Sequence, residues 1–392
     1  MSTLFTNARL CLPNGRVESG ALRVRDGRIA AVGPQVIRES FDEVIDCGGN
    51  LLSPGLIDIH VHGALGRDAM EATPEAFETI CRFHASGGTT TLALTTVCAS
   101  WLDIGAVLDT ARQWRPESGR TGARLAGIHV EGPYFSPERR GAHRPDFLRV
   151  PGENDADHWR RYVDVITKIT LAPELPGMEW LIPQLVEAGI AVSGGHSDAW
   201  DEDAQRAFSH GMRQVTHTFN CMSTSRRRGA LRVAGLLEAA LAKPEVVCEV
   251  IADGHHVSPT LLRMLWNAKG ADRVALITDA TAGAGLEPGA EFELGGISCR
   301  VSEGVAMTAD GAALAGSTAR MIDCLKNVVT LAGVALPEAL RAATVTPAAT
   351  LGLECETGSL TPGMNADLIV FTNDFSICQT WVRGRRVFDA YA

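Results

Sequence analysis

The chain has 392 residues, of which 45% are hydrophobic and 21% are charged, and its formal net charge is −10. This composition excludes intrinsic disorder, which requires low hydrophobicity together with a high net charge. It also argues against binding to nucleic acid or to an anionic membrane surface, because most of an acidic protein surface repels phosphate groups.

The sequence also bears on where the protein works. It has no run of about 18 uncharged apolar residues, so we expect no transmembrane helix. Residues 1–11 lack a basic segment followed by an apolar one, so we expect no secretory signal and predict a cytoplasmic protein. The ten cysteines form no C-x-x-C pair, which favours reduced thiols over a structural zinc site made of thiolates.

The two ends of the chain share one pattern. Residues 1–52 contain short strand-like segments separated by turn signals such as Asn14-Gly15 and Asp26-Gly27. Residues 351–392 repeat this pattern, with apolar segments at 368–371 and 380–382. We predict that the two ends pair into one small β-sandwich domain.

The middle of the chain, residues 53–350, alternates short apolar runs with segments of helical pattern. Near-continuous apolar runs are typical of strands buried on both faces of a parallel sheet. Eight strands are predicted, at residues 55–62, 89–96, 125–133, 166–174, 189–197, 214–220, 246–254 and 273–280. Eight strand–helix units in about 250 residues indicate the α/β class and a (β/α)8 TIM barrel.

Helices are predicted between these strands, at residues 73–87, 101–114, 177–188, 200–210 and 258–269. Thr73-Pro74 and Ser258-Pro259 place a capping hydroxyl before a first-turn proline, which is a helix start signal. An open, doubly wound sheet is the competing fold. It usually carries a Gly-rich phosphate loop after its first strand, and this sequence has no such loop.

Titratable side chains gather at the carboxyl ends of the predicted strands. In chain order they are His60, His62, Glu131, His196, His217 and Asp279. The strand ends of a barrel meet at one mouth, where catalytic groups lie. A lone histidine at a strand end is usually structural, but this set is a joint pattern. Imidazoles and a carboxylate suit Zn²⁺, with Fe²⁺ and Mn²⁺ as alternatives. We therefore predict a divalent-metal site with one or two metals in each subunit.

Other candidate ligands are interpreted as structural. His84, His158 and His210 lie in helical segments, and His129 is expected to pack in the core. Lys168 lies inside the fourth strand, well before its end. For Lys168 we therefore favour a structural role over that of a carbamate-type metal ligand.

Three consecutive arginines, Arg226 to Arg228, follow the sixth strand. They indicate either an anion site, because a guanidinium matches phosphate oxygens, or a solvated charged loop. The residues alone leave both interpretations open.

Longer motifs resemble the amidohydrolase superfamily and, within it, the N-acetylglucosamine-6-phosphate deacetylases. The resemblance covers essentially the whole chain, and the Glu-Gly-Pro and Thr-His motifs are specific to the deacetylases. The matching segments are PGLIDIHVHG (54–63), GGTTT (87–91), HVEGPYFSPERRGAH (129–143), ITKITLAPE (166–174), VSGGHS (192–197), THTFNCM (216–222), IADGHHV (251–257), LITDATAGAG (276–285), LAGSTARM (314–321) and GSLTPGMNADLIVF (358–371).

The resemblance implies metal ligands. Glu131, His196 and His217 resemble the ligands of a principal metal, and His60 and His62 resemble a pair that holds a second metal together with Glu131. Some members of the family lack this pair and use one metal, so the metal count stays open.

The resemblance also implies catalytic and substrate-binding residues. Asp279 resembles the general base, and His143 resembles the group that polarises the acetyl carbonyl. His256 resembles a contact to the sugar phosphate, and Asn220 and Cys221 resemble backbone or amide contacts to phosphate.

In the family, an arginine of the basic loop reaches the neighbouring subunit's site, which implies a homodimer. Arg228 has the matching offset from Asn220, and Arg227 is the alternative. This loop is more basic than the family pattern and is followed by an additional residue. His255 stands where the family commonly has an apolar residue. Both departures concern substrate recognition.

The implied activity is metal-dependent hydrolysis of the acetamide of an N-acetyl amino-sugar 6-phosphate, with N-acetylglucosamine 6-phosphate expected. The galacto epimer and unphosphorylated or differently acylated amino sugars are alternatives. Hydrolysis of a cyclic amide or base is less favoured, because Glu131 rather than a strand-four lysine supplies the bridging carboxylate. A non-catalytic binding barrel is disfavoured, because Asp279 and all ligand histidines are present.

Overall fold

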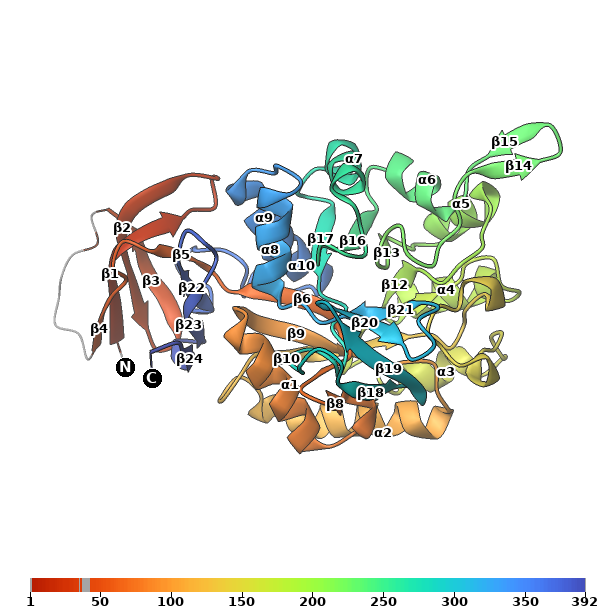
Figure 1. Cartoon of the computed structure of the whole chain (residues 1–392), viewed down its shortest axis with the longest axis horizontal. Helices are drawn as coiled ribbons and strands as arrows, with labels where there is room; N and C mark the ends of the chain where they lie inside the picture. Colours follow the sequence, from red (N-terminus) through yellow and green to blue (C-terminus); the bar gives the residue numbers. More distant parts are fainter. Residues whose placement is uncertain (1, 35, 37–42, 392) are drawn as a thin grey trace.

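The computed structural model describes residues 2–34, 36 and 43–391. Residues 1, 35, 37–42 and 392 belong to the predicted terminal β-domain and lie outside the described residues. In the described chain, a barrel with surrounding helices forms the larger part of the molecule, and a sheet built from both chain ends lies at one side (Figure 1). The predicted domain boundaries at residues 52 and 350 stay predictions.

The barrel strands confirm the predicted TIM barrel. In the described residues, eight parallel strands follow the order β17-β16-β13-β12-β11-β10-β9-β6. They are β6 (Leu56–Val61), β9 (Thr89–Thr95), β10 (Arg124–Glu131), β11 (Ile166–Leu171), β12 (Ala191–Gly194), β13 (Gln214–Val215), β16 (Val247–Ile251) and β17 (Val274–Ile277). A bridge between Val61 and Ala280 brings the two edge strands together.

Burial explains why these segments form strands. Every residue of β6, β9 and β17 is buried, as expected of a sheet that is covered on both faces. Inside the barrel the strands carry polar side chains as well. Thr170 bonds to Thr216, and Ser193 bonds to the same threonine hydroxyl. Buried polar groups require such partners.

The described chain contains ten α-helices, which include the five predicted ones. They are α1 (Pro74–Ser86), α2 (Trp101–Trp114), α3 (Asp155–Arg160), α4 (Met178–Glu187), α5 (Asp201–Ser209), α6 (Leu236–Ala242), α7 (Pro259–Lys269), α8 (Met321–Thr330), α9 (Leu336–Ala343) and α10 (Val345–Thr350). Thr73 caps α1 as predicted, because its hydroxyl accepts the Ala76 N–H at 3.2 Å. None of the described helices is both long and apolar enough to cross a bilayer.

Strands from both chain ends form one sheet, as predicted. In the described residues they are β1 (Ser2–Cys11), β2 (Val17–Arg25), β3 (Arg28–Gly33), β4 (Glu43–Asp46), β5 (Leu51–Pro54), β22 (Leu368–Phe371), β23 (Ile377–Val382) and β24 (Arg385–Asp389). β5 pairs with β22 and so joins the two ends. The sheet curls around its own core, because Phe5 of β1 meets Trp381 of β23 with ring centroids 5.1 Å apart, although β5 and β22 lie between their strands.

Three antiparallel elements of the described chain were not among the predicted ones. A four-stranded sheet follows the last barrel strand and comprises β18 (Glu291–Leu294), β19 (Ile297–Ser302), β20 (Val305–Thr308) and β21 (Leu314–Ser317). The arginine segment forms a hairpin of β14 (Arg226–Arg228) and β15 (Leu231–Val233) that stands out from the barrel (Figure 1). A short pair, β7 (Gly63–Ala64) and β8 (Arg67–Asp68), follows β6.

Candidate active site

Three barrel strands end in a backbone turn that carries a site residue. β12, β13 and β17 each end two residues before His196, His217 and Asp279 respectively, earlier than predicted. These three residues have φ angles of 47°, 31° and 52°. The left-handed region is costly for non-glycine residues, and such strain is concentrated at functional sites. The strands therefore stop where their side chains must turn into the barrel mouth.

Glu131, the last residue of β10, lies at the centre of the mouth. Its Oε1 atom lies 3.4 Å from Nε2 of His196 and 3.2 Å from Nε2 of His217. On the other side, Oε1 lies 3.4 Å from Nε2 of His60, and Oε2 lies 3.3 Å from Nε2 of His62. Four imidazoles from three separate strands thus direct the same ring nitrogen at one buried carboxylate.

Asp279 completes the side of the mouth near β6. Its Oδ1 atom lies 3.3 Å from Nε2 of both His60 and His62. The buried Asp58 carboxylate links the two strands beneath, because it accepts the Thr278 hydroxyl at 2.5 Å and the His60 backbone N–H at 3.3 Å. The relative position of His60 and Asp279 is therefore set by a bonded strand pair.

His196 and His143 are held in opposite tautomers. Nδ1 of His196 lies 2.9 Å from the carbonyl oxygen of Arg139. A carbonyl only accepts, so Nδ1 carries a proton, and in the neutral ring the lone pair lies on Nε2. Nδ1 of His143 instead accepts the Cys98 backbone N–H at 3.2 Å, so the proton of a neutral His143 lies on Nε2. His196 is thus suited to bind a metal, and His143 is suited to donate a hydrogen bond.

Burial keeps His143 neutral. It lowers the pKa of His143 to about 4, although the hydrogen bond to Glu131 acts in the opposite direction. Nε2 of His143 lies 3.5 Å from Oε2 of Glu131, beside the other imidazoles. A neutral Nε2–H donor therefore points into the mouth.

The mouth attracts positive charge. Burial alone would lower the pKa of His60, but the carboxylates of Asp279 and Glu131 outweigh burial and raise it to about 9. The pKa of His62 is raised to about 10, because hydrogen bonds to the same two carboxylates outweigh burial. The folded chain thus stabilises cations at this position, and a divalent metal would replace these protons.

The donor set fits a divalent metal. Two groups of side chains have ligand atoms within 4.8 Å of one another, namely His60, His62 and Asp279, and Glu131, His143 and His196. Oε1 of Glu131 is buried and has no hydrogen-bond partner among the described residues. Imidazole nitrogens around such an oxygen are a typical zinc environment. Because Nε2 of His143 carries a proton and faces the mouth, we do not count His143 among the metal ligands.

A cavity of about 200 Å³ opens above these groups. Asn220, Cys221 and His256, which sequence analysis linked to substrate, line its wall. Leu294 and Leu314 of the unpredicted β18–β21 sheet line it as well. This sheet therefore contributes to the substrate cavity.

His256 pairs with a buried carboxylate at the cavity wall. Its Nδ1 lies 2.7 Å from Oδ2 of Asp253, and the other oxygen of Asp253 accepts the backbone N–H groups of His255 and His256 at 2.9 Å. Burial alone would lower the pKa of His256, but the Asp253 carboxylate raises it. Asp253 thus favours the charged form of the imidazole, which is the form that attracts hydroxyl or phosphate oxygens.

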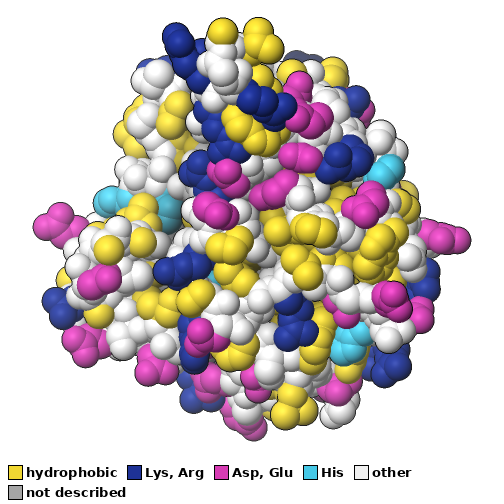
Figure 2. Space-filling model, turned by 90° about the vertical axis from the view of Figure 1, so that its right-hand side faces the viewer, with side chains coloured by type: hydrophobic (Ala, Val, Ile, Leu, Met, Phe, Trp, Pro, Cys, Tyr) yellow, Lys and Arg dark blue, Asp and Glu magenta, His cyan; other side chains and the backbone are white. Residues whose placement is uncertain are grey.

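The arginines of the β14–β15 hairpin differ in their partners. Arg226 pairs with Asp198 and Arg228 pairs with Glu202, both at 2.6 Å. Both also stack on Trp200, at 4.0 and 4.1 Å from the ring centroid. Arg227 lies between them on the opposite face of the strand. Basic side chains gather over the upper part of this side of the molecule, with acidic ones among them (Figure 2).

Arg227 faces another arginine. It lies directly opposite Arg232 in the β14–β15 register, and both side chains are exposed. Like charges directly opposite on two strands destabilise a hairpin unless an anion neutralises them. None of these arginines lines the cavity of the same chain.

The remaining titratable residues lie outside the mouth. Both ring nitrogens of His129 meet threonine hydroxyls, of Thr95 at 3.2 Å and Thr170 at 2.7 Å, as expected of a core histidine. Lys168 lies in the barrel interior, where its Nζ donates to Glu249. Glu249 was not among the predicted site residues, although a charged residue within the apolar run 246–251 is a usable signal.

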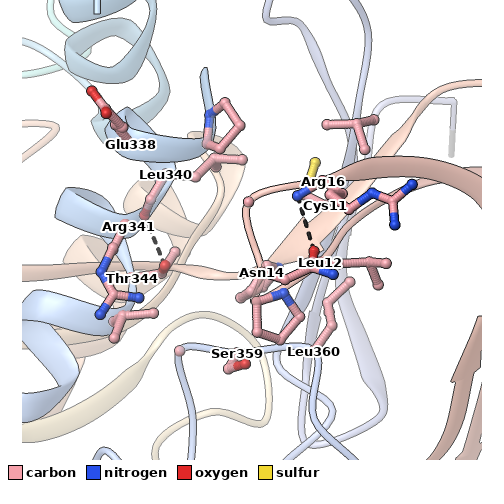
Figure 3. Close-up of a pocket in the computed structure, with 17 residues that line it drawn as sticks. Cys11, Leu12, Asn14, Arg16, Glu338, Leu340, Arg341, Thr344, Ser359 and Leu360 are labelled. Atoms are coloured by element: carbon pink, nitrogen blue, oxygen red, sulfur yellow. Dashed lines mark hydrogen bonds between the residues drawn. The ribbon is translucent and has the colours of Figure 1, made fainter. Parts of the chain in front are cut away.

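A second cavity, of about 240 Å³, lies between the terminal sheet and α9 (Figure 3). The turn around Asn14 lines one side, and Glu338 and Arg341 of α9 line the other. None of the predicted site residues lines it. The chemistry suggested by the sequence therefore belongs to the barrel mouth.

Comparison with known proteins agrees with this geometry. A sequence profile of the amidohydrolase family matches residues 51–387. The chain belongs to the amidohydrolase family. It is 37% identical over 371 residues to the N-acetylglucosamine-6-phosphate deacetylase of Vibrio furnissii, which covers 93% of this chain and 90% of the relative. It is 33% identical to the N-acetylgalactosamine-6-phosphate deacetylase of Escherichia coli O157:H7, with 98% and 99% covered.

Solved structures show the same similarity. The N-acetylglucosamine-6-phosphate deacetylase from Pasteurella multocida superposes with a TM-score of 0.92 at 32% identity, and 98% of this chain and 99% of that chain are covered. A point mutant of the deacetylase from Mycobacterium smegmatis, in complex with N-acetyl-D-glucosamine-6-phosphate, gives 0.89 at 31% identity with the same coverage. The resemblance inferred from the sequence motifs is confirmed.

Proposed function

We propose that this protein is a metal-dependent deacetylase. It hydrolyses the acetamide of an N-acetyl amino-sugar 6-phosphate and releases acetate and the free amino-sugar phosphate. The observation that supports this most directly is the position of Glu131, whose two carboxylate oxygens lie within 3.4 Å of imidazole Nε2 atoms at the ends of several barrel strands. The relatives that act on N-acetylglucosamine 6-phosphate support this sugar as the substrate.

We assign the buried donors to divalent cations. Glu131, His196 and His217 are the ligands of a principal cation, and His60 and His62 hold a second one together with Glu131. Zn²⁺ is expected from this set of nitrogen and oxygen donors. When bound, such a cation polarises the amide carbonyl and lowers the pKa of water from ~15.7 towards ~7.

Asp279 is proposed as the general base. Burial alone would raise its pKa, but in the metal-free chain the charges of His60 and His62 outweigh burial and place it well below the usual range, and a bound cation would supply positive charge in place of these protons. Asp279 is therefore ionised at neutral pH and can take a proton from the attacking water. It then returns this proton to the amide nitrogen, which makes the amine a better leaving group.

His143 is proposed to stabilise the oxygen of the acetyl group. Its Nε2–H points into the mouth because Nδ1 accepts the Cys98 N–H. Negative charge develops on the carbonyl oxygen as water attacks, and a fixed donor stabilises that charge more than it stabilises the neutral amide. His143 thus favours the transition state over the bound substrate.

The sugar phosphate is proposed to bind along the wall that carries His256, Asn220 and Cys221. Arg227 is proposed to reach this phosphate from the second subunit of a homodimer, because the hairpin projects away from its own cavity. The in-chain ion pair of Arg228 makes it the weaker candidate. We also propose a cytoplasmic location, which the ten free cysteines support.

Acetate release from three sugars tests the proposal. The zinc-loaded protein is assayed with N-acetylglucosamine 6-phosphate, its galacto epimer and unphosphorylated N-acetylglucosamine. We expect the highest kcat/KM for the first sugar and the lowest for the last. Equal rates with and without phosphate would contradict phosphate recognition. No acetate from any of the three would overturn the deacetylase assignment.

The galacto epimer is the second candidate substrate. The sequence identity of 33% to a deacetylase of N-acetylgalactosamine 6-phosphate favours the galacto epimer over other sugars. A higher kcat/KM for the galacto epimer would select this candidate.

A further inference from the structure

Lys168 and Glu249 form an ion pair inside the barrel, beneath the metal-ligand cluster. Lys168 comes from β11 and Glu249 from β16, and two strands, β12 and β13, lie between them in the sheet. Lys168 Nζ donates to Oε1 of Glu249. Only 1% of the Lys168 side chain and 0% of the Glu249 side chain are exposed. Neither residue has a role in the proposed reaction so far.

Stability does not explain this pair. Removing two charges from water costs several kcal/mol for each ion. Apolar residues of similar volume usually serve a core as well or better. We therefore infer that this buried ion pair, which lies next to the metal-ligand cluster, has a function in that site.

The second oxygen of Glu249 faces a predicted metal ligand. Oε2 lies 3.5 Å from Nδ1 of His60. Both atoms are buried, and neither has a hydrogen-bond partner among the described residues, which leaves this ion-pair contact as the interaction between them. Nε2 of His60, on the far side of the ring, faces Glu131 and Asp279 at 3.4 and 3.3 Å. The His60 ring thus lies between a carboxylate beneath it and the ligand cluster above it.

We propose that Glu249, held in place by Lys168, is a positioning residue for His60. Its carboxylate accepts the Nδ1–H of His60, so that the Nε2 lone pair is presented to a second divalent cation. Carboxylate partners of this kind fix the tautomer and orientation of metal-binding histidines. This proposal rests on the proposed function, which supplies the metal. It further implies that each chain binds two cations rather than one.

Two double variants test this role. Lys168→Met/Glu249→Leu removes both charges at similar volume and leaves His60 without an acceptor. Lys168→Met/Glu249→Gln also removes both charges, but its side-chain carbonyl can still accept the Nδ1–H. Changing both residues together avoids an unpaired buried charge. If the first variant does not fold, Lys168→Met/Glu249→Thr replaces it, because a threonine hydroxyl is too short to reach His60.

Ser193→Ala is the matched control. Ser193 is also fully buried in the barrel, and its hydroxyl bonds to Thr216 rather than to any predicted ligand. This variant loses an interior hydrogen bond without touching His60 or Glu249.

The readout is the number and affinity of bound cations. Metal-free protein is titrated with Co²⁺, and the ions retained per chain are counted by elemental analysis. We expect two for the wild type and for Ser193→Ala. Lys168→Met/Glu249→Leu should keep the first and bind the second about 10- to 100-fold more weakly. The glutamine variant should recover most of that affinity, which a purely structural role would not produce.

Several outcomes would overturn the inference. They are a wild type that binds one cation, a leucine variant that keeps two with unchanged affinity, and an equal weakening of both cations. Acetate release by the wild type is measured separately. Activity with a single bound cation would leave the proposed function intact and overturn this inference. Two bound cations without any deacetylation would overturn the proposed function and leave this inference intact.

Discussion

The barrel mouth and the β14–β15 hairpin satisfy their charges in different ways. In the mouth, the carboxylates of Glu131 and Asp279 are buried against imidazoles of the same chain. On the outer face of the hairpin, Arg227 and Arg232 oppose each other in solvent. The difference fits the proposal that one chain assembles the reaction chemistry, whereas a second subunit supplies a contact to the phosphate.

Removing the divalent cation should have the largest effect and should act on the mouth alone. Dialysis against a chelator should reduce turnover by more than about 100-fold, because the cation supplies most of the carbonyl and water activation. Added Zn²⁺ should restore it. Light scattering should show an unchanged molecular mass, since the hairpin holds no ligand. Full activity after verified metal removal would contradict the metal site.

The substitution Asp279→Asn is expected to have the second-largest effect on turnover. The amide cannot take the proton of the attacking water, so kcat should fall by about 10²- to 10⁴-fold. KM should change little, because the proposed phosphate contacts lie elsewhere. The measurement is kcat and KM at matched metal content. A variant that loses affinity and keeps kcat would show that Asp279 binds substrate instead.

His143→Gln tests the tautomer argument. Loss of one fixed donor to a developing oxyanion typically costs about 10²- to 10³-fold in kcat. Because the Cys98 N–H occupies Nδ1 and Nε2 carries the proton, the variant should bind as much metal as the wild type. Elemental analysis distinguishes the two roles. A drop in metal content would make His143 a ligand.

The barrel was predictable because its signals are local. Apolar runs mark strands buried on both faces, and each of the eight predicted runs overlaps one observed barrel strand. The convergence of His60, Glu131 and Asp279 followed from the rule that the strand ends of a barrel share one mouth. The predicted strands end later than the observed ones, because the backbone turns into the left-handed region at His196 and His217.

Long-range partners were not predictable in the same way. The β18–β21 sheet does have local signals, namely the alternation Glu-Phe-Glu-Leu in β18 and turns at Gly295-Gly296 and Glu303-Gly304. The contact between Lys168 and Glu249 is different, because 81 residues separate them in the chain. Nothing local to either residue indicates the other, so only the closed barrel shows the pair.

The smallest expected effect distinguishes the arginines of the hairpin. Arg227→Ala should raise KM for the sugar phosphate by about 10- to 100-fold with little change in kcat, as expected for one lost charged hydrogen bond. Arg228→Ala should change KM less, because its guanidinium is already paired with Glu202. Neither variant should alter the KM for an unphosphorylated sugar.

Co-expression shows whether Arg227 acts across the dimer. In a mixed dimer of Arg227→Ala and Asp279→Asn chains, the Arg227→Ala chain keeps its own Asp279 and receives Arg227 from its partner chain. About a quarter of all sites should then regain wild-type KM in a random mixture, although each variant alone is impaired. If Arg227 instead served its own chain, no site in the mixture would hold both groups, and the mixture would show only the two parental activities. A larger KM effect for Arg228→Ala would transfer the role to the arginine that matches the family spacing.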